Sequence, residues 1–207
     1  MIRVHHLNNS RSQRVLWLLE ELGVTYEIVR YTRDKKTMLA PASLRAVHPL
    51  GKSPVVELDG EHLAESGAIV ETVIERLGDG RLAPPRATPE HAKYRYYLHY
   101  AEGSLMPPLL LRLVLSKMGP LGWPALPYVK GQLKLHLDYL EGELAAPFFV
   151  GDALSGADIM LSFPIEAAAA RAGLGPTRPR LTAWLDRIRA RPAYKRARER
   201  GGEFVLG

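Results

Sequence analysis

Cysteine is absent from the 207 residues of the chain. This absence excludes disulfide scaffolds, thiolate zinc sites, iron–sulfur clusters and catalysis by a thiol of the protein itself. Long hydrophobic runs are absent too: no stretch of about 18 uncharged apolar residues occurs, so we expect no membrane span. The first residues, MIRVHHLNNSRSQR, lack the apolar core of a signal peptide. Together these absences predict a cytoplasmic protein without a membrane partner.

The composition that remains is that of a globular protein. Apolar residues make up 46% of the chain and charged residues 24%, which is enough material for the core of one large domain or two small ones. The net charge of +6 permits an anionic ligand. The densest basic run, from Arg187 to Arg200, is typical of the solvated face of a helix. We therefore expect no nucleic-acid partner and keep binding through this run as the weakest alternative.

Periodicity predicts alternating strands and helices over the first 78 residues. Short apolar or alternating runs indicate strands at residues 2–7, 25–31, 54–58 and 61–65. Apolar residues at helical spacing indicate helices at residues 12–22, 43–47 and 66–77. Asp59-Gly60 is typical of a hairpin turn between the last two strands. The first strand, the first helix and the second strand predict a right-handed βαβ unit.

The strand signals disappear after residue 78. Residues 79–89 contain three prolines and are typical of a linker. Helical patterns then cover residues 90–118, 123–145, 155–173 and 180–199. We expect Pro107-Pro108 to interrupt the first of these helices, because proline removes a backbone donor and clashes with the preceding turn. This order predicts a mixed α/β domain at 1–78 and an all-helical domain at 90–207.

Three short motifs in the N-terminal part have the chemistry of a binding site. NNSRSQR (8–14) joins the first strand to the first helix, where N–H groups and hydroxyls meet a positive helix end. Ser53-Pro54 stands where a loop enters a strand, and Glu65-Ser66 opens a helix. Each motif alone also has a plain structural explanation, namely a helix cap for the first and third and a tight turn for the second.

A fourth motif lies in the helical part. Ser155 and Asp158 have the spacing of a capping box at the start of a helix, with Asp in place of Glu or Gln. With the four motifs in this order, the chain resembles the cytosolic glutathione transferases, in particular bacterial members with a serine in the first turn. The resemblance covers nearly the whole chain, and it gives the capping box a structural role.

The resemblance implies a fold and an activity. The expected fold is a thioredoxin-like glutathione-binding domain at 1–78, a linker at 79–89 and a helical domain at 90–207 that contributes the pocket for a second substrate. The expected activity is attack of the glutathione thiolate on an electrophilic small molecule. Glutathione is then a co-substrate, no metal takes part, and the enzyme works as a homodimer.

The resemblance also assigns roles to residues that bind glutathione. The backbone of Ser53 is expected to bind the cysteinyl part, with Pro54 in the cis form. Glu65 and Ser66 are expected to hold the γ-glutamyl end. Lys52 is the candidate for the glycine carboxylate, although by itself it is typical of a solvated surface charge.

The residue that acts on the thiol is expected in the first turn. Members of the family use Tyr, Ser or Cys there, and this turn holds neither tyrosine nor cysteine. Ser10 matches the serine-type members under one alignment, whereas Asn9 occupies the position when the gap moves by one residue. Either side chain stabilises the thiolate as a hydrogen-bond donor, so it is not a nucleophile and no general base is needed.

The second substrate is expected against the first long helix after the linker. Met106, Leu110 and Leu113 have helical spacing there and are the candidates that line an apolar pocket, although the same spacing is typical of a helix core. Apolar electrophiles are the expected class of substrate. The sequence leaves the identity of the electrophile and the physiological role open.

The same sequence features leave other functions open. A glutathione-dependent peroxidase or isomerase would use the same site, and a non-catalytic protein could keep the fold to bind an apolar ligand or a partner. His5-His6 does not predict a metal site, because adjacent side chains on a strand point to opposite faces. The G-x-S-x-G turn of serine hydrolases is absent.

Overall fold

The computed structural model describes residues 1–206 and divides the chain into two compact units. The N-terminal unit comprises Met1–Ala83 together with Arg189–Val205, and the helical unit comprises Pro84–Ile188 together with Leu206. The change of unit after Ala83 falls within the expected linker 79–89. The expected helical domain 90–207 differs in one respect, since its last helix belongs to the N-terminal unit.

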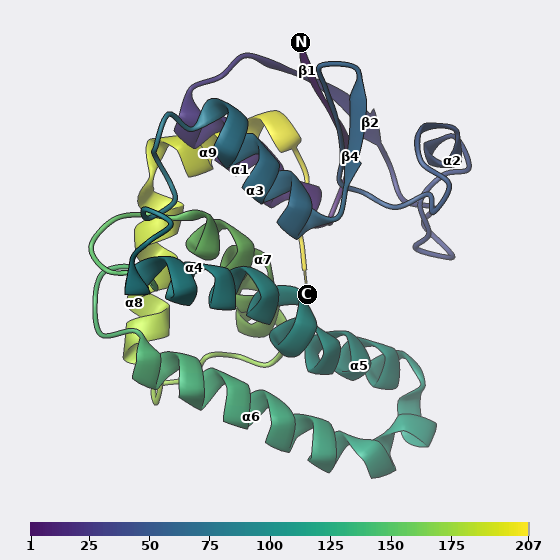
Figure 1. Cartoon of the computed structure of the whole chain (residues 1–207). Coiled ribbons are helices and arrows are strands. Elements are labelled where there is room, and N and C mark those ends of the chain that lie inside the picture. Colours follow the sequence, from purple (N-terminus) through teal and green to yellow (C-terminus); the bar gives the residue numbers. More distant parts are fainter. Residues whose placement is uncertain (207) are drawn as a thin grey trace. The chain divides into compact units, whose positions relative to one another are not determined.

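The N-terminal unit is a four-stranded sheet with helices, which confirms the expected thioredoxin-like class. Its elements are β1 (Ile2–Leu7), α1 (Ser12–Leu22), β2 (Tyr26–Tyr31), α2 (Leu44–Val47), β3 (Val55–Leu58), β4 (Glu61–Ala64), α3 (Ser66–Leu77) and α9 (Pro192–Gly201). The strand order is β2-β1-β3-β4. Figure 1 shows α1, α3 and α9 gathered on one face of this sheet, with α2 beyond the other face.

The pairing of the strands follows from their connections. β1 is parallel to β2, from Ile2 opposite Tyr26 onward, because α1 carries the chain back between them. β3 and β4 are antiparallel and joined by Asp59 and Gly60, whose φ angles of 52° and 87° are those of a tight hairpin turn. Both the βαβ unit and the hairpin predicted from the sequence are therefore confirmed.

Helix α1 buries the apolar side predicted from its spacing. Val15, Leu16, Leu18 and Leu19 are fully buried. The helix ends at Gly23, whose φ of 69° is a left-handed conformation that glycine adopts without strain. At about 25 cal/mol per Å² of apolar surface, each of these side chains contributes roughly 1.5–3 kcal/mol of burial free energy.

The C-terminal basic run is used inside the N-terminal unit. The sequence predicted one helix over 180–199, and this was wrong: α8 ends at Ala190 and α9 begins at Pro192. Arg191 has a ψ of 133°, since a residue before proline is disfavoured in the α conformation. The break lets α9 pack on α1. Two arginines of α9, and the arginine just before it, form ion pairs with two carboxylates of α1. These pairs are Arg191–Glu21, Arg196–Glu20 and Arg200–Glu20, at 2.6, 2.7 and 2.8 Å.

The second unit is helical, as expected. Its elements are α4 (Pro89–Tyr100), η1 (Ala101–Leu105), α5 (Met106–Lys117), η2 (Gly119–Ala125), α6 (Leu126–Glu143), α7 (Gly156–Arg171) and α8 (Pro179–Ala190). The interruption expected at Pro107-Pro108 is confirmed, because the turn η1 just before it is a π-helix. None of the helices described within residues 1–206 is long and apolar enough to cross a membrane.

Asp158 organises the helical unit from its interior. The side chain is fully buried, and its carboxylate accepts hydrogen bonds from Ser155 N (3.1 Å) and Ser155 Oγ (2.9 Å), which confirms the capping box. It also accepts from Phe149 N and from Trp184 Nε1, both at 3.0 Å. Burial raises the pKa of this carboxyl, and the four donors act in the opposite direction. One carboxylate thus joins a loop, the start of α7 and the tryptophan of α8.

We predict that Asp158→Asn destabilises the protein by roughly 2–4 kcal/mol, because an amide group leaves some of the four buried donors unsatisfied. Urea unfolding at neutral pH measures the difference. Asp152→Asn is the matched control, since Asp152 is exposed in the same loop. Equal free energies of unfolding in the two variants would contradict the structural role of Asp158.

Candidate functional site

The turn between β1 and α1 carries both candidate thiol-stabilising residues. Asn9 has a φ of 52°, a left-handed conformation that asparagine tolerates better than most residues. Ser10 is only 4% exposed. Its Oγ accepts a hydrogen bond from Ser12 N at 3.2 Å, as a helix cap does, and lies 2.8 Å from Ser12 Oγ. Asn9 is half-buried beside it, so the two candidates differ in accessibility.

A chain of hydrogen bonds leads inward from Ser10. Ser12 Oγ lies 2.8 Å from His6 Nδ1, and His6 Nε2 lies 3.0 Å from the carbonyl oxygen of Gly201 at the end of α9. A carbonyl only accepts, so Nε2 carries the proton of the imidazole. Burial lowers the pKa of His6 to about 4. The ring is therefore neutral at pH 7, and its Nδ1 accepts from the Ser12 hydroxyl.

Asn9 has a different set of partners. Its Oδ1 accepts from the backbone N–H of Val205 at 2.5 Å, and its carbonyl oxygen accepts from Arg33 Nη2 at 3.4 Å. Arg33 also donates from Nε to the carbonyl oxygen of Asn8 at 3.2 Å. Neither Arg33 nor Val205 was found by the sequence analysis. No motif marks them, because Arg33 donates to backbone carbonyl oxygens and Val205 donates from its own backbone N–H.

The peptide bond Ser53-Pro54 is cis, as the resemblance implied. The hydroxyl of Ser53 donates to the carbonyl oxygen of His5 at 2.8 Å and accepts from Leu7 N at 3.2 Å, which fastens the loop to β1. Within residues 1–206, the backbone N–H and C=O of Ser53 form no hydrogen bond. This backbone is therefore free to pair with an extended peptide-like ligand.

The Glu65-Ser66 pair lies at the start of α3. Glu65 is exposed and has a φ of 67°, a strained conformation for a residue with a side chain. Ser66 is buried, and its Oγ lies 3.4 Å from Nη2 of the buried Arg14 on α1. The N–H groups of the first turn of α3 add a positive helix end. Hydroxyl, guanidinium and helix end together suit a carboxylate. Arg14 was not among the residues picked from the sequence.

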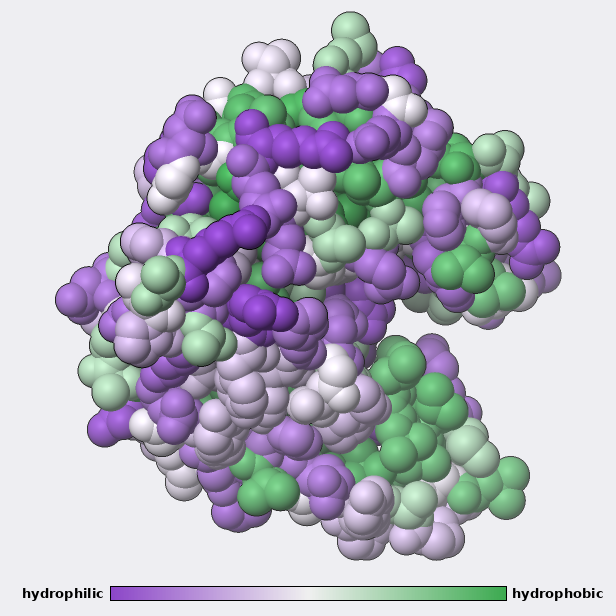
Figure 2. Space-filling view, in the orientation of Figure 1, coloured by the Kyte–Doolittle hydropathy of each residue, from purple (hydrophilic) through white to green (hydrophobic). Residues whose placement is uncertain are grey.

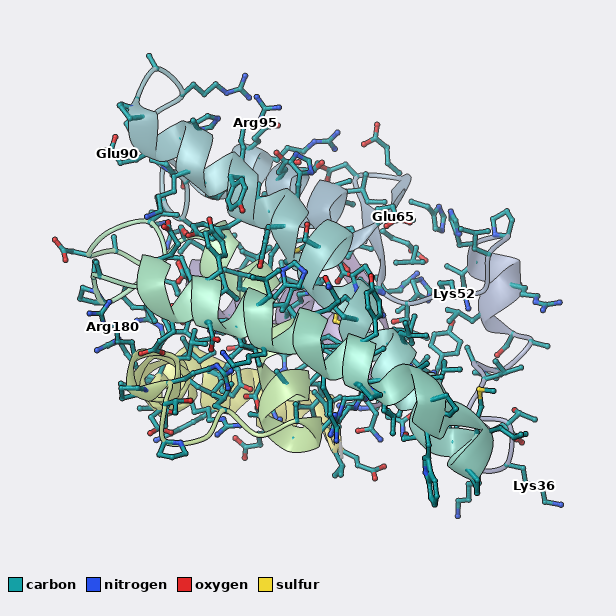
Figure 3. All side chains as sticks on the ribbon, turned by 90° about the horizontal axis from the view of Figure 1, so that it is seen from below. Lys36, Lys52, Glu65, Glu90, Arg95 and Arg180 are labelled. Atoms are coloured by element: carbon teal, nitrogen blue, oxygen red, sulfur yellow. The ribbon has the colours of Figure 1, made fainter. Side chains whose placement is uncertain are left out.

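The structure brings the motifs together through β1 and α1. The N–H of Leu7 lies 3.3 Å from Ser12 Oγ and 3.2 Å from Ser53 Oγ, so the first turn and the cis-proline loop share one backbone donor. Arg14, two residues further along α1, reaches Ser66 of the third motif. Lys52 is exposed on the loop before Ser53. Figure 3 shows Lys52 and Glu65 on separate loops of the N-terminal unit.

The residues expected to line the second-substrate pocket all lie on or at the start of α5 in the helical unit. Met106 is buried in the core of that unit, Leu110 is 50% exposed, and Leu113 is intermediate. Of the three, Leu110 therefore presents the most apolar surface to a ligand, whereas Met106 has the burial of a core residue.

The two histidines of β1 have separate partners. His5 lies 2.8 Å from Glu57 Oε1 through Nε2 and 2.9 Å from the Tyr31 hydroxyl through Nδ1. His6 is bound to Ser12 and Gly201, as described above. Each ring has both nitrogens engaged, which agrees with side chains pointing to opposite faces of the strand.

We predict that the burial of neutral His6 makes stability fall with acidification. The unfolded chain binds a proton at a pKa of about 6.5 and the folded chain only near pH 4. Stability is therefore lost as the pH falls from 6.5 toward 4. Between pH 7 and pH 5, the wild type should lose about 2 kcal/mol more than His6→Gln in urea unfolding. A parallel pH dependence of the two proteins would contradict this environment of His6.

Comparison with known proteins identifies the family. The model "Glutathione S-transferase, N-terminal domain" matches residues 1–73, and "Glutathione S-transferase, C-terminal domain" matches residues 114–192. Glutathione S-transferase 1 of Saccharomyces cerevisiae is 35% identical, over 97% of this chain and 95% of its own length. Glutathione S-transferase 3 of Schizosaccharomyces pombe is 34% identical, over 100% of this chain and 90% of its own length.

Solved structures agree with these relatives. A glutathione S-transferase from Actinobacillus pleuropneumoniae superimposes with a TM-score of 0.88 at 36% identity. The superposition covers 100% of this chain and 95% of the other. With a family model for each end of the chain, relatives above 30% identity over nearly its whole length and this shared fold, the chain belongs to the glutathione S-transferase family.

Proposed function

We propose that this glutathione transferase binds glutathione along the edge formed by the three N-terminal motifs and activates its thiol at the Asn9–Ser10 turn. The observation that carries the proposal is the junction at Leu7 and Arg14. Through it the first turn, the cis-proline loop and the start of α3 are held by shared hydrogen bonds. Glutathione suits a site that spans the three motifs, because it has a peptide backbone, a thiol in the middle and a carboxylate at each end.

Each part of glutathione has a partner in this scheme. The N–H and C=O of Ser53, which have no partner within residues 1–206, bind the cysteinyl backbone as a neighbouring strand would. Ser66 and the helix end of α3 receive the γ-glutamyl carboxylate, and Glu65 accepts from the γ-glutamyl ammonium. Lys52 meets the glycine carboxylate as an exposed cation. The strained φ of Glu65 supports a binding role, because such outliers concentrate at ligand sites.

The energetic demand on the turn is modest. A thiol with a pKa near 8.5 is only about 3% ionised at pH 7. Lowering this pKa by about two units makes most of the thiol reactive thiolate and needs about 2.7 kcal/mol. A hydrogen bond to a charged group supplies roughly 1.5–3 kcal/mol and a helix N-terminus roughly 0.3–1. One side-chain donor beside the start of α1 is therefore sufficient.

The thiolate then attacks a small electrophile of apolar character. The bond that forms joins the glutathione sulfur to the electrophilic carbon, and the leaving group departs with its electron pair. Leu110, with Met106 and Leu113 behind it on α5, is the proposed apolar lining. Capture of reactive compounds in this way is a detoxification chemistry. A peroxidase or isomerase reaction would use the same thiolate. A non-catalytic protein that binds an apolar ligand or a partner is the alternative that is not an enzyme.

Two further features belong to the proposal. Large apolar side chains are exposed on the helical unit over α5, η2 and α6, where Figure 2 shows hydrophobic surface near the end of α5. They include Leu111, Val114, Met118, Leu121, Trp123 and Leu135. Exposed apolar area of this kind supports the proposed homodimer. We place the enzyme in the cytoplasm, since the reduced glutathione pool that supplies its thiol is kept there.

We predict that Ser66→Ala weakens glutathione binding by about tenfold, because a hydrogen bond to a carboxylate is worth roughly 1.5–3 kcal/mol. Isothermal titration calorimetry with glutathione measures the dissociation constant. Ser116→Ala is the matched control, since Ser116 is an exposed serine on α5 whose hydroxyl donates to the carbonyl oxygen of Leu113 in its own helix. An unchanged dissociation constant in Ser66→Ala would remove this residue from the site.

A further inference from the structure

The hydroxyl proton of Ser10 is already used inside the protein. His6 accepts at Nδ1, so Ser12 donates its single hydroxyl proton there. Ser12 Oγ can then only accept in its 2.8 Å contact with Ser10 Oγ, which makes Ser10 the donor. The contact from Ser12 Oγ to the carbonyl oxygen of Leu7 is longer, at 3.3 Å, and competes weakly. A thiolate in front of Ser10 would therefore meet the lone pairs of a buried hydroxyl.

The side-chain amide of Asn9 has the opposite arrangement. The N–H of Val205 can donate only to an oxygen, so the 2.5 Å contact fixes which end of the amide is Oδ1. Nδ2 is then the other amide atom, and it has no acceptor among residues 1–206. Asn9 is half-buried at the start of α1, where the helix end also favours a negative charge.

From this geometry we propose that Nδ2 of Asn9 donates the hydrogen bond to the glutathione thiolate, and that the backbone N–H of Val205 orients the amide for this task. The proposal rests on the proposed function and names its donor. Ser10 then acts as a positioning residue, since its hydroxyl ties the turn to Ser12 and His6. Residues 202–205, after the end of α9, become part of the glutathione site.

Residues 202–205 are held near the turn by several contacts. Arg198 donates from Nη2 to the carbonyl oxygen of Phe204 at 3.3 Å, and its guanidinium lies 4.4 Å from the centre of the Phe204 ring. Asn8 Nδ2 donates to Glu203 Oε2 at 3.4 Å. Val205 is 62% exposed, so its side chain packs little and its N–H is the group that matters.

Charged groups around the turn are the same in every variant proposed below. Arg33 donates to the carbonyl oxygens of Asn8 and Asn9. Burial lowers the pKa of Arg33, and the positive charge of Arg11 lowers it further. Glu203 supplies a carboxylate on the other side, next to Asn8. Differences in the thiol pKa between the variants therefore report the hydrogen-bond donor.

The first test compares Asn9→Gly with Ser10→Ala. Glycine keeps the left-handed backbone of position 9 without strain and removes only the amide. Thiolate absorbance of bound glutathione is recorded against pH in each full-length variant. We expect Asn9→Gly to raise the pKa of the bound thiol by about one unit or more, a tenfold loss of thiolate at neutral pH. Ser10→Ala should shift it by less than about a third of that. The reverse order would overturn the assignment.

The second test isolates the orienting N–H. Val205→Pro removes this donor, whereas Val205→Ala removes the side chain and keeps it. We expect Val205→Pro to raise the pKa of the bound thiol and to lower kcat several-fold at neutral pH, with little change in the dissociation constant for glutathione. Val205→Ala keeps the N–H, so it should raise the pKa of the bound thiol by clearly less than Val205→Pro does. Equal behaviour of the two variants would show that the N–H of Val205 does not orient Asn9.

The same measurements separate this proposal from the function on which it rests. If the wild type fails to bind glutathione or leaves the thiol pKa unshifted, the proposed function fails. If the wild type lowers the thiol pKa and Asn9→Gly keeps the full shift, the proposed function stands and the assignment to Asn9 fails.

Discussion

The close approach of the end of α9 to β1 is the contact on which the site depends. His6 Nε2 donates to the carbonyl oxygen of Gly201 at 3.0 Å. Burial lowers the pKa of this imidazole to about 4, so the ring is neutral at pH 7. A Cβ on Gly201 would lie 2.5 Å from Gln13 Oε1 and 2.9 Å from Leu16 Cδ1, so a larger residue here would displace side chains of α1. The neutral ring accepts the Ser12 hydroxyl proton at Nδ1. The oxygen of Ser12 is then left to accept the hydroxyl proton of Ser10.

A second consequence is that the N-terminal unit is completed by the far end of the chain. Arg191, Arg196 and Arg200 form ion pairs with Glu20 and Glu21 on α1, whose side chains are only 9% exposed. These ion pairs give three arginines of the basic run a structural role. This arrangement also places Glu203 and Val205 beside the first turn, where they bond to Asn8 and Asn9.

Much of the fold could be predicted from local patterns. For example, the apolar residues that α3 buries, Ile69, Val70, Val73 and Ile74, recur at helical spacing in the sequence. The Ser53-Pro54, Glu65-Ser66 and Ser155/Asp158 pairs were also visible, since they need particular residue types. The break before Pro192 was missed although its signal was present. The partners of Asn9 could not be predicted, because the N–H of Val205 is common to all residues except proline and lies 196 positions away.

The most direct test of the account is the pKa of the glutathione thiol in the bound state. Calorimetry establishes saturable binding, and thiolate absorbance against pH in the same preparation gives the pKa. The account predicts a pKa at least about one unit below the usual value near 8.5. Saturable binding with an unshifted pKa would contradict it, because the turn between β1 and α1 would then hold glutathione without activating it.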